Sequence, residues 1–400
     1  MAHSVDRILT THVGSLVRPP ELAEFYRRMQ DGETYDESAY AECLRASVAQ
    51  VVRKQAQTGI DIVSDGEYGK TQTWSRYVMD RLNGFEFRLL RPGEKPSAGA
   101  ASLTGRDRET FPEFYAEWDK TQQGVSLRAP GRWVCTAPIS YKGQALVGRD
   151  IDNLKQGLRK ANIDSGFLPV VAPGSVVPER KEEHYADDEA YTFAVAEALR
   201  SEYRAIVDAG LTLQVDDAHL PFAFERMVPP GTLADYRKWA EMRLTALNHA
   251  LEEIPEERTR YHICWGSWSG PHSADVPLRN IVDLVMQVRV GGYLIEGANA
   301  RHEHEWRVWE KVKLPEGSVL IPGVVSHHTN VVEHPELVAE RLVRLARLVG
   351  RENVIGGTDC GFAQGPLVRR VHPTVMWAKL DALVEGARIA TQELWGRKST

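Results

Sequence analysis

This 400-residue chain has few cysteines, no long apolar run and no excess of positive charge. Four scattered cysteines cannot build a disulfide framework, so each is either a small buried apolar side chain or a working thiolate; they are Cys43, Cys135, Cys264 and Cys360. No apolar run approaches the roughly 20 residues that span a bilayer, which excludes membrane-spanning helices. The net charge of −6 offers no electrostatic footprint for nucleic acid or an anionic membrane, so neither is expected as a partner.

The remaining composition is ordinary for a globular protein. Hydrophobic residues make up 42% of the chain and charged residues 26%, which is enough for a large core. The first residues, "MAHSVDRILTTHVGS", lack the basic-then-apolar pattern of a signal peptide, and a cytoplasmic location is expected. At roughly 150 residues per domain the length allows two or three domains, but a single α/β barrel can also reach this size. The oligomeric state is not specified, and a homo-oligomer stays open.

Short β-branched runs recur along the chain, and most are followed by a longer segment whose apolar residues repeat every three or four positions. Such alternation predicts βαβ units and a parallel sheet. Roughly eight units at this length favour a (β/α)₈ TIM barrel, and an open doubly wound sheet is the alternative, weakened by the absence of a G-x-G-x-x-G turn after the first strand. Nine strand-like runs are present, so one is expected outside the ring; they are 7–15, 60–67, 132–140, 166–174, 211–220, 260–267, 292–299, 318–327 and 353–362.

Two stretches are expected to be insertions into a single catalytic barrel domain that spans residues 1–400. Residues 88–131 are polar and rich in proline and glycine, with aromatic islands, and a loop of that length in a barrel is usually functional. Residues 221–258 are mostly helical and follow the fifth strand-like run. Both would leave the ring of strands unchanged.

Nearly every predicted strand ends in polar residues. In a barrel the chemistry lies at the carboxyl ends of the strands, and a purely structural barrel has no need for so many charges at one rim. The set therefore predicts a functional site there; it comprises Gly14-Ser15, Asp65-Gly66-Glu67, Asp216-Asp217, His262-x-Cys264, Glu296, His327-His328 and Asp359-Cys360.

The segment "YHICWG" (261–266) carries the pattern most suggestive of a metal. Residues two apart in a strand point to the same side, so His262 and Cys264 can share one ion. Glu296 ends the next strand and Cys360 ends the last. Two thiolates, an imidazole and a carboxylate suit tetrahedral Zn²⁺. By spacing alone the alternative stays open that the histidine and cysteines pack in the core and that Glu296 pairs with an arginine.

A second polar run, "RHEHEW" (301–306), is interpreted as a helix start. His302 and His304 would lie about 200° apart around a helix axis and could not share an ion. Metal-ligating side chains are usually held by hydrogen bonds from neighbouring polar groups. The polar residues of this run could supply such hydrogen bonds beside a metal site.

Several of these motifs, in order along nearly the whole chain, resemble the cobalamin-independent methionine synthase family. They are "THVGS", "SDGE", "LQVDD", "HICWG", "LIEGAN", "PGVVSHHTN" and "GGTDCGF". The resemblance implies a methionine synthase/uroporphyrinogen decarboxylase-like TIM barrel, without the additional N-terminal barrel of the longer members. It also implies site residues: zinc ligands at His262, Cys264, Glu296 and Cys360, amino-acid-binding residues at Ser15, Glu67 and Asp216, and a proton donor at His328.

The chain departs from that family pattern at several places. Asp217 stands where the family usually has Glu, His219 replaces a nearby Pro, and "DCGF" lacks the basic continuation. His327 precedes His328, so the proton donor is ambiguous by one residue. These departures concern the substrate rather than the metal.

The implied chemistry is transfer of an alkyl group to sulfur. A free thiol has a pKa of about 8.5 and only its thiolate attacks, whereas Zn²⁺ deprotonates a coordinated thiol. The sequence thus predicts a zinc-dependent thiol methyltransferase that acts on homocysteine, with a 5-methyltetrahydrofolate-type or simpler methyl donor. Its partners would be a small-molecule thiol and an alkyl donor.

Three alternatives accompany this prediction. The epoxyalkane:coenzyme M transferases are also similar, and they add a sulfonate-bearing thiol to an epoxide; Glu67 and Asp216 favour the ammonium of homocysteine instead. A zinc-stabilised but catalytically silent barrel would have a closed four-ligand site. A decarboxylase of the uroporphyrinogen type needs no metal, and the ligand set argues against it.

Four tryptophans could either stack a pterin ring of the methyl donor or simply pack in the core or at the rim. They are Trp74, Trp133, Trp265 and Trp268.

Overall fold

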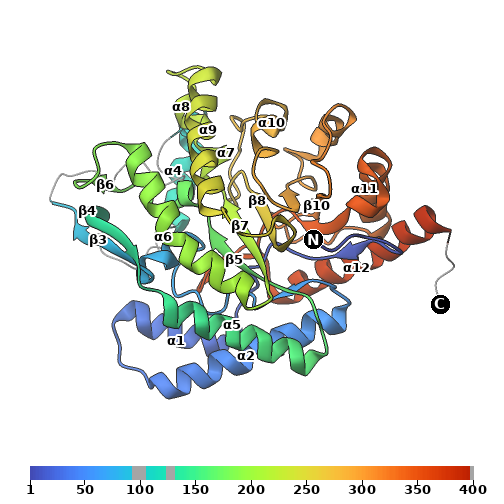
Figure 1. The fold of residues 1–400 in the computed structure, drawn as a ribbon, viewed down its shortest axis with the longest axis horizontal. Helices are drawn as coiled ribbons and strands as arrows, with labels where there is room; N and C mark the ends of the chain where they lie inside the picture. The colour runs from blue at the N-terminus through green and yellow to red at the C-terminus, as the bar shows by residue number, and fades with distance from the viewer. Residues whose placement is uncertain (92–104, 123–130, 397–400) are drawn as a thin grey trace.

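A computed structural model describes residues 1–91, 105–122 and 131–396, and its centre is an eight-stranded parallel sheet (Figure 1). The strand order is β1-β11-β10-β9-β8-β7-β5-β2: from β2 to β11 each strand of the sheet pairs with the next one along the chain, and β11 pairs with β1. Almost every residue in these strands is buried, as expected for a parallel sheet covered on both faces. The strands are β1 (Leu9–Thr10), β2 (Val63–Ser64), β5 (Gly166–Val171), β7 (Thr212–Asp217), β8 (Thr259–Ile263), β9 (Gly292–Ile295), β10 (Val319–Val325) and β11 (Ile355–Thr358).

The two edge strands of this order, β1 and β2, share no ladder, but their chain segments are hydrogen-bonded. The carbonyl oxygen of Thr10 accepts from the backbone nitrogens of Asp61 and Ile62, both at 3.1 Å. The hydroxyl of Ser64 donates to the carbonyl of Gly14 at 3.0 Å. The sheet is therefore curled in the manner of an α/β barrel, as predicted, although regular pairing is not continuous around the whole ring.

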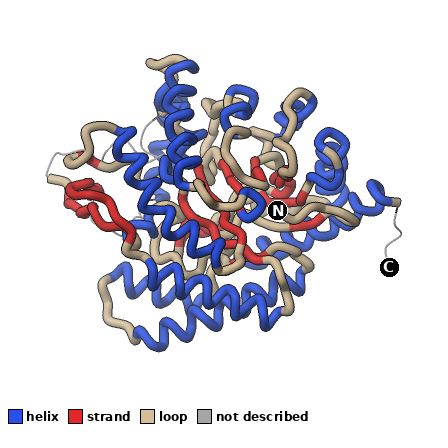
Figure 2. The backbone as a smooth tube through the Cα atoms, in the orientation of Figure 1, coloured by secondary structure: helices blue, strands red, loops and turns tan. Residues whose placement is uncertain are grey.

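Helices surround the strands (Figure 2). Neighbouring helices contact one another around the ring, and the last one, α12, contacts α11, α2 and β1. Caps define several ends: Asp36 accepts from two backbone N–H groups at the start of α2, and Thr232 with Asp235 forms a capping box on α9. The larger helices are α1 (Pro20–Asp31), α2 (Glu37–Thr58), α5 (Gln144–Ala161), α6 (Asp188–Asp208), α9 (Leu233–Ala250), α11 (Pro335–Val349) and α12 (Pro373–Trp395).

Shorter helical segments connect the strands to these helices. None of the described helices is both long and apolar enough to cross a membrane. The short segments are α3 (Arg106–Thr110), α4 (Pro112–Gln122), α7 (His219–Phe222), α8 (Phe224–Met227), α10 (Val282–Val285), η1 (Arg76–Asp80), η2 (Pro173–Ser175), η3 (Glu256–Arg258), η4 (Leu278–Asn280), η5 (Glu303–Glu310) and η6 (Arg351–Asn353).

One of the nine strand-like runs lies outside the ring, as predicted. It is the run 132–140, which forms β4 (Gly131–Tyr141) in a separate sheet with β3 (Leu82–Leu89) and β6 (Lys181–Glu182). A small hairpin of β12 (Ala363–Gly365) and β13 (Val368–Arg369) follows the last ring strand.

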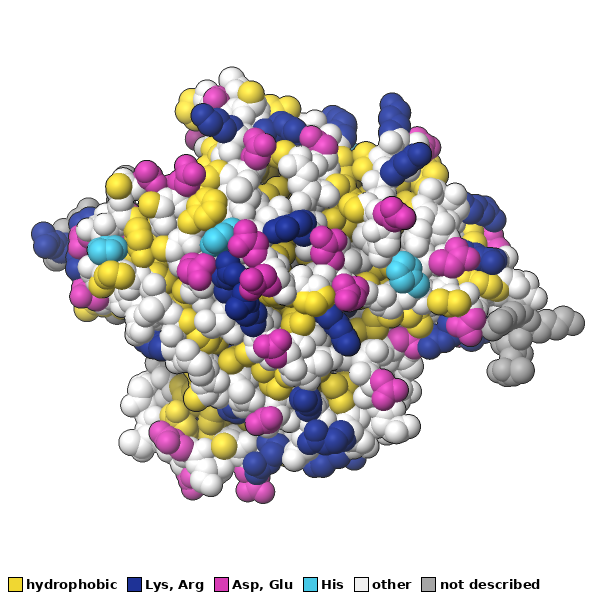
Figure 3. Space-filling model, viewed as in Figure 1, with side chains coloured by type: hydrophobic (Ala, Val, Ile, Leu, Met, Phe, Trp, Pro, Cys, Tyr) yellow, Lys and Arg dark blue, Asp and Glu magenta, His cyan; other side chains and the backbone are white. Residues whose placement is uncertain are grey.

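The two stretches expected to be insertions contain helices where they are described. The stretch 88–131 includes α3 and α4, and its residues 92–104 and 123–130 lie outside the described residues. The stretch 221–258 includes α8 and α9, and α9 packs against α6. On the face drawn in Figure 3, acidic and basic side chains are interspersed and neither sign forms a continuous field.

A buried ion-pair network ties the outer sheet to the ring helices. Arg81 pairs with Asp150 of α5 at 2.5 Å and with Glu202 of α6. The hydroxyl of Tyr141 also donates to Glu202, at 2.8 Å. All three charged side chains are buried, and desolvation of such charges is offset only while every partner is present.

The substitution Arg81→Met should therefore lower the free energy of unfolding by about 3–5 kcal/mol, because it leaves buried Glu202 without a cation and Asp150 with Arg149 alone. Urea unfolding followed by circular dichroism measures this. Arg347→Met is the matched control, because Arg347 forms an exposed pair with Glu393 and its loss should change stability little. Equal effects of the two substitutions would contradict the assignment of the Arg81 network as a structural tie.

Candidate metal centre

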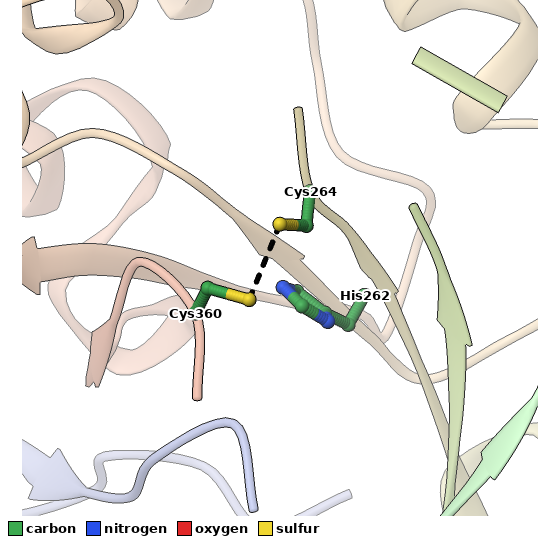
Figure 4. Close-up of side chains that lie close together, drawn as sticks. All are labelled: His262, Cys264 and Cys360. Atoms are coloured by element: carbon green, nitrogen blue, oxygen red, sulfur yellow. Dashed lines mark hydrogen bonds between the residues drawn. The ribbon is translucent and has the colours of Figure 1, made fainter. Parts of the chain in front are cut away.

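Two strand ends that are distant in sequence bring a histidine and two cysteines together. His262 lies on β8, Cys264 follows that strand by one residue, and Cys360 follows β11 by two. One ligand atom from each lies within 4.8 Å of the others, and all three residues are buried (Figure 4). The two sulfur atoms are 3.2 Å apart, and both cysteines are free thiols.

The charge state of these groups is set by their mutual contacts. Burial lowers the pKa of His262, but hydrogen bonds to Asp216 and Cys360 outweigh it and raise that pKa to about 10. The pKa of Cys360 is lowered, first by the hydrogen bond that the Cys264 thiol donates to it and then by His262. The same bond, together with burial, raises the pKa of Cys264. Without a metal the cluster thus favours one thiolate, one thiol and an imidazolium.

The orientation of the imidazole is fixed by its surroundings. Nδ1 of His262 lies 3.1 Å from Oδ1 of Asp216, and Nε2 lies 3.3 Å from the carbonyl oxygen of Asp359. A carboxylate on one ring nitrogen is the usual partner of a metal-binding histidine, because it fixes the tautomer and makes the other nitrogen a better ligand. Asp216, expected to bind an amino acid, is in the structure also the partner of His262.

The donor set fits zinc on chemical grounds. Sulfur and imidazole donors select Zn²⁺ over Mg²⁺ or Ca²⁺, which prefer oxygen. The two buried free thiols lie 3.2 Å apart beside an imidazole, so that one ion could bind both sulfur atoms. Three protein donors also leave room for a further ligand, as catalytic zinc sites require.

Glu296, the fourth ligand implied by the sequence, does not belong to this cluster of atoms within 4.8 Å. Its Oε1 accepts from the backbone nitrogen of Trp265 at 3.0 Å. Its Oε2 accepts from the side-chain amide of Asn299 at 2.7 Å and pairs with Arg301 at 3.2 Å. Burial acts to raise the pKa of Glu296, but Arg301 and nearby histidines lower it overall. The carboxylate is therefore a buried anion, near enough to Cys264 to raise the thiol pKa, whose oxygens are already held by protein donors.

The loop that carries Cys360 is fastened to the loop after β9. Oδ1 of Asp359 accepts from the backbone nitrogens of Gly297 and Ala298, both at 2.8 Å. On its other side, a Cβ at Gly361 would lie 2.7 Å from Cβ of Ser15, so the close approach of these two segments needs glycine. These contacts fix where Cys360 presents its sulfur.

A cavity of about 290 Å³ opens over the cluster. It is lined by the three clustered residues and by all three residues expected to bind an amino acid, namely Ser15, Glu67 and Asp216. Among the tryptophans considered as stacking partners, Trp74 and Trp268 line it, whereas Trp133 and Trp265 do not. Glu296 and His328 are not part of its lining.

The side chains predicted to bind the substrate differ in whether they already have a hydrogen-bond or ion-pair partner in the protein. The hydroxyl of Ser15 is buried and has no hydrogen-bond partner among the described residues. Glu67 has a φ of +60° and pairs with Lys70 at 3.1 Å. Burial raises the pKa of Glu67, while Lys70 opposes the shift. Both acids expected to bind an ammonium are therefore at the cavity wall, and each already has a protein partner.

The two adjacent histidines after β10 have different environments. Nε2 of His328 lies 2.6 Å from Nη2 of Arg301 and can only accept that hydrogen bond. Burial and Arg301 lower the pKa of His328 to about 3, so its ring is neutral at pH 7 with the proton on Nδ1. His327 is fully buried, and neither of its ring nitrogens has a partner among the described residues.

Sequence reasoning missed the role of Arg301. Its guanidinium contacts Glu296, His328 and, at 2.7 Å, Asp275. The only signal was its place at the head of the polar run 301–306, and η5 does begin within that run. His302 of the same run pairs with Asp275 at 3.3 Å and with Glu305 at 2.8 Å, and neither partner belongs to the metal cluster.

Several known proteins are similar to this chain over nearly its whole length. No family model matches the chain. The methionine synthase of Thermococcus kodakarensis is 22% identical over 391 residues, which is 96% of this chain and 94% of the relative. The 2-hydroxypropyl-CoM lyase of Xanthobacter autotrophicus is also 22% identical, over 97% of this chain and 96% of the relative.

A solved structure supports the fold. The B12-independent methionine synthase from Shewanella sp. W3-18-1 superposes with a TM-score of 0.70 at 20% identity, covering 98% of this chain and all of that one. The chain is thus similar over nearly its whole length to proteins named methionine synthase and to the 2-hydroxypropyl-CoM lyase, and it shares the fold of a B12-independent methionine synthase.

Proposed function

We propose that the protein is a zinc-dependent thiol alkyltransferase that transfers a methyl group to the thiol of homocysteine. The observation that carries the proposal is the meeting of His262, Cys264 and Cys360 at the floor of a cavity that could hold a small molecule. Relatives named methionine synthase that align over the whole chain support the choice of reaction.

His262, Cys264 and Cys360 would hold the zinc ion, and Glu296 would add negative charge beside it. When bound, zinc supplies the acidity that turns a substrate thiol into a thiolate at neutral pH. Two cysteine thiolates and a carboxylate outweigh the charge of one Zn²⁺, so sulfur at this site stays electron-rich and able to attack carbon.

The remaining residues position the thiol substrate and exclude water. Asp216 and Glu67 lie on the cavity wall where an ammonium group could interact with them, and the unpaired Ser15 hydroxyl offers a hydrogen bond beside them. Holding the thiol and the alkyl donor together in one cavity removes much of the entropic barrier to transfer. The cavity wall also contains Trp74 and Trp268, which could stack a flat donor.

His328 is proposed to handle the proton of the leaving group. Because Arg301 donates to its Nε2, the neutral ring carries its proton on Nδ1, and that proton is the one it can share. His327, whose two ring nitrogens have no partner among the described residues, is the alternative within the same loop.

A second candidate reaction is addition of a sulfonate-bearing thiol to an epoxide. One ground for it is that the 2-hydroxypropyl-CoM lyase is as similar to this chain, at 22% identity, as the methionine synthase of Thermococcus kodakarensis. The other is that Glu67 and Asp216 already pair with Lys70 and His262, which makes both carboxylates less available to an ammonium group. The two reactions share the metal cluster and differ in what binds the far end of the thiol.

The reaction itself is tested by incubating zinc-loaded enzyme with homocysteine or 2-mercaptoethanesulfonate, each paired with a methylfolate or a short epoxide. Methionine, detected by mass spectrometry, is the expected product. A thioether from the sulfonate and epoxide alone would favour the second candidate. If no pair yields a thioether while bound zinc is stoichiometric, the alkyltransferase proposal is wrong.

Metal content should follow the clustered thiols. Cys264→Ser and Cys360→Ser should each lose most of their zinc after dialysis, because an alcohol does not replace a thiolate ligand. Cys135→Ser is the matched control, since Cys135 is buried in β4 outside the cluster and should leave one zinc per chain. Zinc is measured by plasma mass spectrometry and folding by circular dichroism; retention of zinc in both cluster variants would refute the site.

The pH dependence of turnover should lack a His328 titration. Its pKa is lowered to about 3, so the ring is already neutral above pH 5 and its charge cannot change between pH 5.5 and 8. His328→Gln should lower kcat by about 10²- to 10⁴-fold, the usual contribution of a proton-transfer group, and leave the shape of the profile unchanged. An inflection near pH 6.5 that disappears in this variant would contradict the assignment. His334→Gln, at an exposed helix start, serves as the control.

A further inference from the structure

We propose that Arg370 is the anchor for an oxyanion of the substrate, a carboxylate or a sulfonate, within the cavity over the metal cluster. The inference rests on the proposed function for the identity of the substrate, and it adds a cationic partner for the acidic end of the thiol, which no residue predicted from the sequence supplies. It makes Arg370 a specificity-determining residue.

The hairpin after β11 carries Arg370 back over the cluster. The backbone nitrogen of Arg370 donates to the carbonyl of Phe362 at 2.9 Å, so the chain returns to a point two residues beyond Cys360. Its side chain lies against the segment that carries the other cysteine: Nε and Nη2 are 3.4 and 3.3 Å from the hydroxyl of Ser267. Arg370 thereby lines the same cavity as Cys264 and Cys360.

Among the described residues, Arg370 pairs with no carboxylate, unlike Arg76, which also lies on the cavity wall. Arg76 pairs with Glu179, whose Oε1 lies 3.1 Å from its Nε. Within the described residues Arg370 is in no ion pair, and Ser267 is the side chain to which it donates. A guanidinium has five N–H donors, so most of those of Arg370 remain available to a ligand.

The guanidinium of Arg370 is partly buried, and among the described residues only the two clustered cysteines balance its positive charge. Burial lowers the pKa of Arg370, and the negative charge of the Cys360 and Cys264 sulfurs opposes that shift. Those thiolates would be committed to a metal ion. A planar guanidinium then matches a carboxylate or a sulfonate, to which it can donate two parallel hydrogen bonds.

The resulting arrangement accounts for both ends of a short thiol. Its sulfur would lie toward the cysteine cluster and its oxyanion toward Arg370, with the unpaired Ser15 hydroxyl on the same cavity wall. Homocysteine offers a carboxylate and 2-mercaptoethanesulfonate a sulfonate, so the anchor serves either candidate reaction. The two candidate reactions are distinguished by whether the ammonium group of homocysteine strengthens or weakens binding of the thiol substrate.

The first test uses anions that contain no thiol. Binding of butanoate and ethanesulfonate to zinc-loaded enzyme is measured by calorimetry, with 1-butanol as the neutral probe. Arg370→Gln should weaken the binding of at least one anion by about 10- to 100-fold, the usual value of a hydrogen-bonded charge pair, and leave the alcohol unaffected. Arg370→Lys should recover part of the loss. Arg76→Gln, which removes a guanidinium already paired with Glu179, should change anion binding less than threefold.

Equal anion binding by the wild type and Arg370→Gln, or the absence of saturable binding of both anions to the wild type, overturns the proposal. Retention of zinc and of the wild-type melting temperature in Arg370→Gln shows that a loss of binding is not a loss of structure. Preference for butanoate identifies a carboxylate as the natural oxyanion, and preference for ethanesulfonate identifies a sulfonate.

A second measurement separates this inference from the proposed function. Zinc-edge X-ray absorption is recorded with 2-mercaptoethanol and with 2-mercaptoethanesulfonate. Both thiols should alter the zinc signal of the wild type, and Arg370→Gln should need about tenfold more of the charged thiol but not of the neutral one. If no thiol changes the signal, the alkyltransferase proposal fails, while the thiol-free anions still decide the role of Arg370.

Discussion

The contact between the sulfur atoms of Cys264 and Cys360 is the constraint on which the site depends. The residues follow β8 and β11, and two further strands lie between those strands in the sheet. In a flat sheet three strand spacings would separate them by about 14 Å, at roughly 4.8 Å each. A separation of 3.2 Å requires the sheet to curl so that its strand ends face one another across a common mouth. The same curling explains why the edge segments near Thr10 and Asp61 are hydrogen-bonded without a regular ladder.

Buried charge near the cluster forms two groups. In the first group, Arg301 contacts Glu296, Asp275 and His328, and neither Glu296 nor His328 lines the cavity. In the second group, Glu67 and Arg370 lie on the cavity wall; Glu67 pairs with Lys70, whereas Arg370 pairs with no carboxylate among the described residues. The first group is satisfied within the protein. The second keeps N–H donors of Arg370 that an anionic ligand could accept.

The two reactions proposed for this chain differ in the group at the far end of the thiol, and both would use the same cavity. An amino-acid thiol needs one protein group to bind its carboxylate and another to bind its ammonium, whereas a sulfonate-bearing thiol needs only a cation to bind its sulfonate. Asp216 is held by His262 and by the side-chain amide of Gln214, and it lines the cavity as well. Its availability to a ligand is therefore coupled to the orientation of the imidazole that would bind the metal.

Local patterns in the sequence determined much of this protein, because they depend on periods of two and 3.6 residues. They gave the alternation of strands and helices, the one strand-like run that lies outside the ring, and the placement of His262 and Cys264 at the end of β8. Family motifs added Ser15, Glu67 and Cys360 to the same cavity. Only the tertiary structure decided that Asn299 and Arg301 engage Glu296, that Arg301 makes His328 an acceptor, and that a hairpin returns Arg370 to the cluster without a carboxylate. These contacts join residues whose spacing along the chain carries no periodic signal, and they are set by how loops pack once the sheet has curled.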